Sequence, residues 1–71
     1  MEMGNYEKAL DDFMKAVELD PSGLTYFNKG LANYHLKNYE EALDDINKSL
    51  EYDPDNEKHL QIKAKVEAEM Q

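Results

Sequence analysis

The sequence predicts an all-α protein built from a repeated helical unit. Residues 5–21 recur thirty-three positions later as residues 38–54, and eleven of the seventeen aligned residues are identical. In both copies the apolar residues return every three or four positions, which is the period of one buried helix face. A repeat of this length indicates one unit copied along the chain, with each copy burying its apolar face on the next.

Each copy of the repeat is predicted to be a helix that ends before a proline. In the first copy Asn5 is the expected N-cap, preceded by Gly4 as a loop residue, and Pro21 closes the helix because the residue before a proline disfavours the α conformation. The second copy closes in the same way at Pro54. The apolar stripes are Tyr6, Ala9, Leu10, Phe13, Ala16 and Val17 in the first copy, and Tyr39, Ala42, Leu43, Ile46, Ser49 and Leu50 in the second.

A helix of a second type is predicted between the copies, over residues 24–36. Gly30 lies in its middle, where glycine costs roughly 1 kcal/mol relative to alanine, so we expect a neighbouring helix to approach closely there. The links on either side, residues 22–23 and 37–38, are so short that consecutive helices must be antiparallel. The apolar residues of this helix are Leu24, Phe27, Leu31 and Tyr34, with Tyr26 as a second edge.

A fourth helix is predicted over residues 57–70, with Asp55 and Asn56 as N-cap candidates. A terminal helix needs only one buried face, but this one carries two apolar stripes on nearly opposite sides. The second stripe predicts either loose packing or a contact beyond the chain. The stripes are Leu60, Ala64 and Ala68 on one side, and Ile62, Val66 and Met70 on the other.

The composition argues against several classes of function. The chain has no cysteine, which excludes disulfides, zinc–thiolate sites and thiol catalysis. Sixteen acidic residues against eight lysines give a net charge of −8, and without arginine the chain is poorly suited to nucleic acid or to anionic membranes. No apolar run approaches the ~20 residues of a membrane span, and a signal-peptide pattern is absent. We expect a soluble cytoplasmic, or otherwise intracellular, protein.

The complete unit resembles the tetratricopeptide repeat family. That family has an aromatic residue and then a glycine early in its helix A, a tyrosine that opens helix B, alanines within B and a closing proline. The residues at the family's motif positions here are Tyr26, Gly30, Ala32, Tyr39, Ala42, Ile46, Ser49, Leu50 and Pro54. Three residues depart from the pattern, because Lys29, Lys37 and Ser49 stand where the family usually has leucine, glycine and alanine.

The resemblance implies an α-solenoid fragment of four antiparallel helices in the order B, A, B, A′, with Gly30 and Ala42 as the small pair at the closest helix crossing. Residues 1–71 are then one domain with unequal parts. Residues 22–54 are a complete repeat, and residues 4–21 are helix B of a preceding repeat whose helix A is missing, apart from residues 1–3 as a remnant. Residues 55–71 correspond to a following helix A or a capping helix.

The resemblance also implies a non-enzymatic scaffold for protein–protein interaction, which binds a peptide or protein segment on the concave face of the A helices. Asn28 matches an asparagine with which some members hold a ligand's terminal carboxylate or backbone. A complete carboxylate clamp is not expected, because the preceding helix A and any arginine are absent, so a solvated Asn28 is the favoured interpretation. The candidate peptide-binding residues are Leu24, Asn28, Leu31, His35 and Lys58.

Two alternatives remain open beside the peptide scaffold. The chain could be a fragment of a longer array with no independent function, or a self-association module that forms a homo-oligomer, either a simple dimer or a domain-swapped one. Self-association follows from the missing helix A, which leaves apolar surface uncovered, and exposed apolar surface marks an interface. The candidate residues for self-association are Leu10, Phe13, Met14, Val17, Ile62, Val66 and Met70.

Catalytic and metal sites have weak support in the sequence. His35 and His59 lie on different helices without metal-ligand spacing, so we expect two surface or edge histidines rather than a zinc site. The acidic residues at positions 53, 55 and 57 fit a turn and helix cap better than a calcium loop. The acidic pairs at 11–12 and 44–45 are predicted to be solvated outer faces. We expect no enzyme activity and no cofactor, and a metal-dependent enzyme is a distant third alternative.

Overall fold

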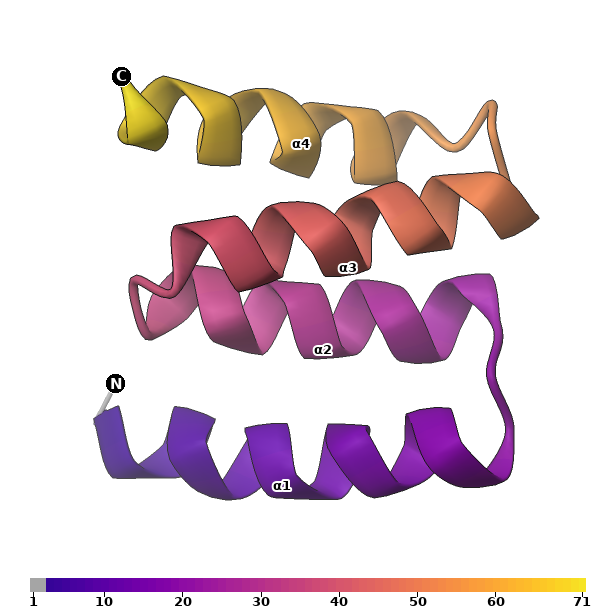
Figure 1. The fold of residues 1–71 in the computed structure, drawn as a ribbon, viewed down its shortest axis with the longest axis vertical. Coiled ribbons are helices and arrows are strands. Elements are labelled where there is room, and N and C mark those ends of the chain that lie inside the picture. The colour runs from indigo at the N-terminus through magenta and orange to yellow at the C-terminus, as the bar shows by residue number, and fades with distance from the viewer. Residues whose placement is uncertain (1–2) are drawn as a thin grey trace.

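The described residues form four antiparallel helices. The computed structural model describes the backbone of residues 3–71 and the side chains of residues 5–71. The helices are α1 (Met3–Leu19), α2 (Gly23–His35), α3 (Tyr39–Tyr52) and α4 (Glu57–Met70). In the view of Figure 1 they follow one another in chain order and are joined by short turns at alternate ends. The predicted all-α fold class is confirmed.

The core lies around α3. That helix packs against α2 on one side and α4 on the other, α2 also reaches α4, and α1 contacts only α2 among the described helices. Among the side chains of residues 5–71, the buried apolar ones are Ala32, Ala42, Ile46 and Val66. The shortest of the three extents, 32 × 30 × 18 Å, exceeds the width of one helix, about 10–12 Å, so the helices are staggered in depth. No helix within residues 3–71 is long and apolar enough to cross a bilayer.

The first helix begins earlier than the sequence predicted. Because α1 starts at Met3, Gly4 and Asn5 belong to its first turn, and the prediction of a loop residue and an N-cap is wrong. The second copy of the repeat does begin at the expected place, with α3 starting at Tyr39, because a tight turn from α2 immediately precedes it. The expected remnant of a preceding helix falls mainly on residues 1 and 2, which lie outside the described residues.

The start of α2 is fixed by a pair of reciprocal hydrogen bonds. The backbone N–H of Thr25 donates to the Ser22 hydroxyl at 3.2 Å, and the backbone N–H of Ser22 donates to the Thr25 hydroxyl at 2.9 Å. This capping box satisfies two backbone donors that the first turn of a helix leaves free. It sets the direction in which α2 leaves the turn after Pro21.

The end of α2 is a Schellman turn that reverses the chain into α3. The N–H of Asn38 donates to the carbonyl of Asn33 at 2.9 Å, and the N–H of Lys37 donates to the carbonyl of Tyr34 at 3.0 Å. This geometry requires a left-handed residue between the helices, and Lys37 supplies it with a φ of 67°. Lysine therefore occupies a position where glycine is the usual residue.

Gly30 lies where α2 and α3 approach closely, as its place in mid-helix predicted. A Cβ added to it would lie 2.8 Å from Cδ1 of Ile46 and 3.1 Å from Cβ of Asp45. Its nearest neighbours are therefore Ile46 and Asp45, and not Ala42 as the family pattern implied. Ala42 lies about one turn earlier on α3 and is itself fully buried.

The fourth helix packs through the stripe that contains Ile62 and Val66. Val66 is fully buried, Ile62 is half-buried, and the ring of His59 stacks on Phe27 of α2 at a centroid distance of 4.2 Å. The prediction that Val66 offers surface for self-association is therefore wrong. With this stripe turned inward, His59 lies against α2. The residues left exposed are Leu60, Ala64 and Ala68.

Candidate functional site

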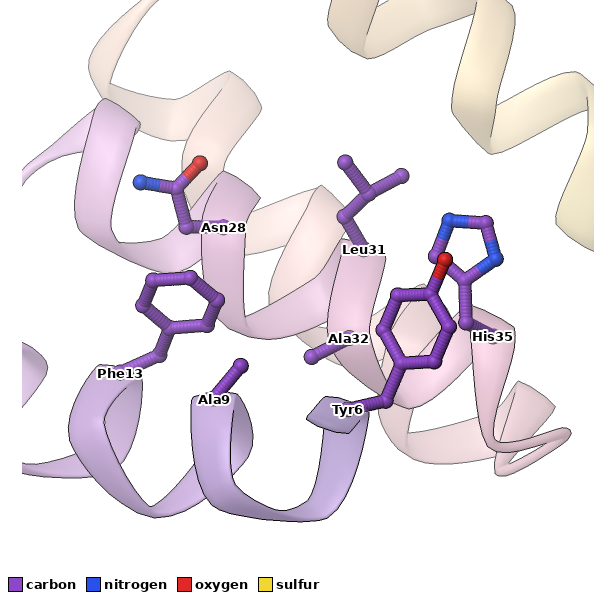
Figure 2. Close-up of a pocket in the computed structure, with 7 residues that line it drawn as sticks. All are labelled: Tyr6, Ala9, Phe13, Asn28, Leu31, Ala32 and His35. Carbon is purple, nitrogen blue, oxygen red and sulfur yellow. The ribbon is translucent and has the colours of Figure 1, made fainter. Parts of the chain in front are cut away.

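A pocket of about 220 Å³ opens between α1 and α2. Figure 2 shows its lining, in which two aromatic rings from α1 face side chains of α2. Pockets that hold a drug-sized ligand usually have about 300–1,000 Å³, so this one suits a single peptide side chain. The lining residues are Tyr6, Ala9 and Phe13 from α1, and Asn28, Leu31, Ala32 and His35 from α2.

The walls of the pocket are mostly apolar, with one amide at the edge. The ring of Tyr6 stacks on that of His35 at a centroid distance of 4.3 Å and an angle of 21°, and this pair closes one end. Phe13 lies towards the other end, next to Asn28. The Asn28 side chain makes no hydrogen bond to the described residues, so its donor and acceptor are available to a ligand.

Three of the five predicted peptide-binding residues line this pocket. Asn28, Leu31 and His35 are brought together because they lie one helical turn apart on the same face of α2. Leu24 is outside the lining and is 66% exposed. Lys58 is exposed in the first turn of α4 and also lies outside the lining.

The α1 wall of the pocket was not predicted from the sequence. Tyr6, Ala9 and Phe13 are all half-buried, and none of them was among the predicted peptide-binding residues, although Phe13 was predicted to mediate self-association. The stripe on α1 is wider than the surface that α2 covers, so part of it remains open. Among the other residues predicted for self-association, Leu10 and Val17 are half-buried and Met14 is exposed.

A chain of polar contacts crosses the interface between α2 and α3. The ammonium of Lys29 lies 3.1 Å from Oδ1 of Asp45, the side-chain amide of Asn33 donates to Oδ2 of Asp45 at 2.9 Å, and Asn38 Nδ2 donates to Oδ1 of Asn33 at 3.3 Å. Asp45 is only 5% exposed, so the prediction that it belongs to a solvated face is wrong, whereas Asp44 is exposed as predicted. Burial of the carboxylate is tolerated because a cation and an amide satisfy it.

The two histidines have different environments. His35 is exposed, whereas His59 is buried, so the prediction of two surface or edge histidines is wrong for His59. Its Nδ1 is buried and has no hydrogen-bond partner among the described residues. This burial lowers the pKa of His59 below its usual value, and the nearby Asp53 opposes the shift only in part. No group of side chains suited to a metal ion occurs within the described part of the chain.

Comparison with protein-family models matches two segments of the chain. A model described as tetratricopeptide repeat matches residues 24–56. A second model with the same description matches residues 1–22. Comparisons with curated proteins and with solved structures gave no match.

Proposed function

The chain belongs to the tetratricopeptide repeat family, whose members generally mediate protein–protein interaction, and we propose that it binds an extended peptide segment along α2. The family is a non-catalytic scaffold family, and the proposal assigns no reaction to the chain. The observation that carries it is the pocket in which Asn28, Leu31 and His35 meet the aromatic residues of α1.

The proposed ligand places one apolar side chain in the pocket and its backbone against the Asn28 amide. Burial of such a side chain contributes roughly 1.5–3 kcal/mol, and one hydrogen bond adds roughly 0.5–1.5 kcal/mol. A micromolar complex needs about 8 kcal/mol, so the pocket alone supports only weak binding. The remaining binding free energy must come from further contacts of the peptide, for example with the exposed side chain of Leu24.

The net charge of −8 favours ligands with basic residues beside the apolar anchor. Opposite charge speeds the association of such peptides and makes it dependent on salt. An acidic peptide C-terminus fits less well, because the chain has no arginine and Lys58 lies outside the pocket lining. The proposed ligand is therefore a basic peptide with an apolar anchor, and not a peptide held by its terminal carboxylate.

An array of basic peptides with one central leucine or phenylalanine tests the proposal. For the best binder, the double substitution Asn28→Ala and Leu31→Ala should weaken binding about tenfold or more while helicity is retained. The matched control is Asp11→Ala with Asp44→Ala, which changes two exposed acids outside the pocket. Loss of binding in the control but not in the pocket variant would instead favour the outer acidic face.

Exposed apolar side chains on both outer helices support self-association as a second candidate. Met14 and Leu19 on α1, and Leu60 and Met70 on α4, are all exposed. Exposed side chains of this size on the first and last helices offer surface for a second copy of the chain. This candidate requires neither Asn28 nor the pocket, so measurement of the oligomeric state separates it from peptide binding.

A further inference from the structure

Another pocket, of about 200 Å³, opens between the beginning of α2 and the end of α3. These two segments lie at the same end of the molecule (Figure 1). The pocket shares no residue with the one between α1 and α2, and its volume again suits a single side chain. We refer to it as the Tyr52 pocket, and its lining consists of Tyr26 from α2 and Lys48, Glu51 and Tyr52 from α3.

Two tyrosine rings form the aromatic wall of the Tyr52 pocket. The rings of Tyr26 and Tyr52 stack at a centroid distance of 6.0 Å and an angle of 23°. Gly23 permits this contact, because a Cβ added to it would lie 3.3 Å from the carbonyl oxygen of Ser49 and 3.3 Å from Cβ of Tyr52. Tyr26 is half-buried and Tyr52 is 55% exposed, so Tyr26 supports the ring that Tyr52 offers to a ligand.

Glu51 supplies a carboxylate beside these rings, and its ion pair within the protein is weak. The ammonium of Lys48 lies 3.9 Å from Oε2 of Glu51, which is at the long end of ion-pair distances, and both side chains are exposed. Water screens an exposed pair of this kind, so it contributes little to stability. A cation brought by a ligand can therefore replace Lys48 at the Glu51 carboxylate at small cost.

The chemistry of the Tyr52 pocket favours a cation over an anion. The face of a tyrosine ring attracts positive charge, and a carboxylate pairs with it. Around the pocket, residues 48–58 carry four acidic side chains and two lysines, in keeping with the net charge of −8 for the whole chain. The surrounding charge therefore attracts a cationic group and repels a phosphate or carboxylate.

We propose that the Tyr52 pocket binds an arginine side chain of another polypeptide segment. A group contacts a ring face at about 3.5–4 Å, so two rings whose centroids are 6.0 Å apart cannot hold a cation between them. The pocket is therefore open on one side and is not a cage for a methylated ammonium. A planar guanidinium suits it, because this group stacks on the exposed part of the Tyr52 ring and forms two parallel hydrogen bonds to the Glu51 carboxylate.

The arginine comes from outside these 71 residues, which contain none. The site does not rest on peptide binding between α1 and α2, because Asn28 and Leu31 are outside the lining of the Tyr52 pocket. Substitutions in one pocket leave the lining residues of the other unchanged, so either proposal can fail while the other stands.

The probe is a capped pentapeptide with one arginine between two pairs of glycines, and the readout is the NMR signals of the Tyr26 and Tyr52 rings. We expect these signals to shift and saturate with a Kd of about 1 mM. A lysine peptide of the same charge should bind about threefold more weakly or worse, because an ammonium neither stacks nor forks. Free arginine, whose own carboxylate the surrounding acids repel, should also bind more weakly than the arginine peptide. Equal affinity for the two peptides, or for free arginine and the arginine peptide, would overturn the proposal.

Substitutions at exposed positions of α3 test the assigned roles without disturbing the core. Glu51→Gln should weaken binding of the arginine peptide about fivefold or more, and Tyr52→Leu about threefold or more. Lys48→Gln should tighten binding, because it removes the cation that competes for Glu51. The matched control Glu40→Gln removes the same charge elsewhere on α3 and should change the Kd less than about twofold. Equal effects of Glu51→Gln and Glu40→Gln, or weaker binding in Lys48→Gln, would overturn the proposal.

Discussion

Single residues decide how the chain turns between α2 and α3, and Lys37 is the one under strain. Its φ of 67° places a side chain in the left-handed region, which costs a non-glycine residue roughly 1–2 kcal/mol. The Schellman hydrogen bonds on either side hold it there. The sequence signalled this position, because the family pattern has glycine where this chain has lysine.

Replacing Lys37 with glycine should therefore stabilise the protein. The substitution removes the left-handed strain. It also gives the unfolded chain more conformational freedom, which lowers the free energy of unfolding by roughly 0.5–1 kcal/mol. We therefore expect a net increase of about 0.5–1 kcal/mol in the free energy of unfolding. Urea denaturation measures it. The control Lys15→Gly, in the middle of α1, should lower the free energy of unfolding by about 1 kcal/mol. A loss at Lys37 similar to that at Lys15 would contradict the argument.

At the scale of single residues, the candidate site was only partly predictable from the sequence. Helical spacing and the family resemblance placed Asn28, Leu31 and His35 on one face of α2, and the structure brings them into one pocket. The burial of Asp45 was not predictable, because Asp44 and Asp45 are adjacent and identical in type. Which of them is buried depends on the position of Lys29 and Asn33, sixteen and twelve residues earlier on another helix.

At the scale of helices, periodicity and breakers identified every element but not every orientation. The number and order of the helices followed from the two prolines, Pro21 and Pro54, and from the helical pattern around Gly30 between them. The sequence did not determine which face of α4 is buried, because its two stripes are similarly apolar. In the structure the stripe with Ile62 and Val66 faces inward, and His59 contacts Phe27. The start of α1 was also missed, since neither Gly4 nor Asn5 prevents a helix from continuing.

The burial of His59 makes the docking of α4 sensitive to pH. The folded protein holds His59 with a lowered pKa, whereas the unfolded chain takes up the proton near the usual value of about 6.5. The stability that neutral His59 contributes is therefore fully present above a pH of about 6.5. It is lost as the pH falls from this value through the pKa of His59 in the folded protein. We expect the urea midpoint to decrease between pH 7 and pH 5.

Two histidine variants separate this effect from the titration of other groups. His59→Phe preserves an aromatic ring against Phe27 and removes the proton-binding site, so it should reduce the dependence of the urea midpoint on pH. His35→Phe changes the exposed histidine and should leave the dependence in place. If both variants retain the full slope between pH 7 and pH 5, titration of His59 does not control the stability of α4.

At the scale of the whole molecule, the core and the uncovered surface lie in different places. The buried side chains gather around α3, while α1 is packed on one side only and α4 exposes its second stripe. A domain of this size has a free energy of unfolding of only about 4–10 kcal/mol. Burying one more large apolar side chain is worth roughly 1.5–3 kcal/mol, which is a large share of that stability.

Association of two chains should therefore be measurable at high protein concentration. A contact that covers Met14 and Leu19 on α1 and Leu60 on α4 removes three exposed apolar side chains from water. The expected gain of roughly 5–9 kcal/mol only just offsets an association cost of at least about 4 kcal/mol, so dimers should form at high micromolar to millimolar protein. The melting temperature should then rise with protein concentration, as mass action requires.

Sedimentation equilibrium gives the mass of the associated species directly. The double substitution Leu19→Gln and Leu60→Gln should weaken association, whereas the control Asp11→Ala with Asp44→Ala should not. A monomer at millimolar concentration with a concentration-independent melt would show that the exposed side chains do not mediate self-association.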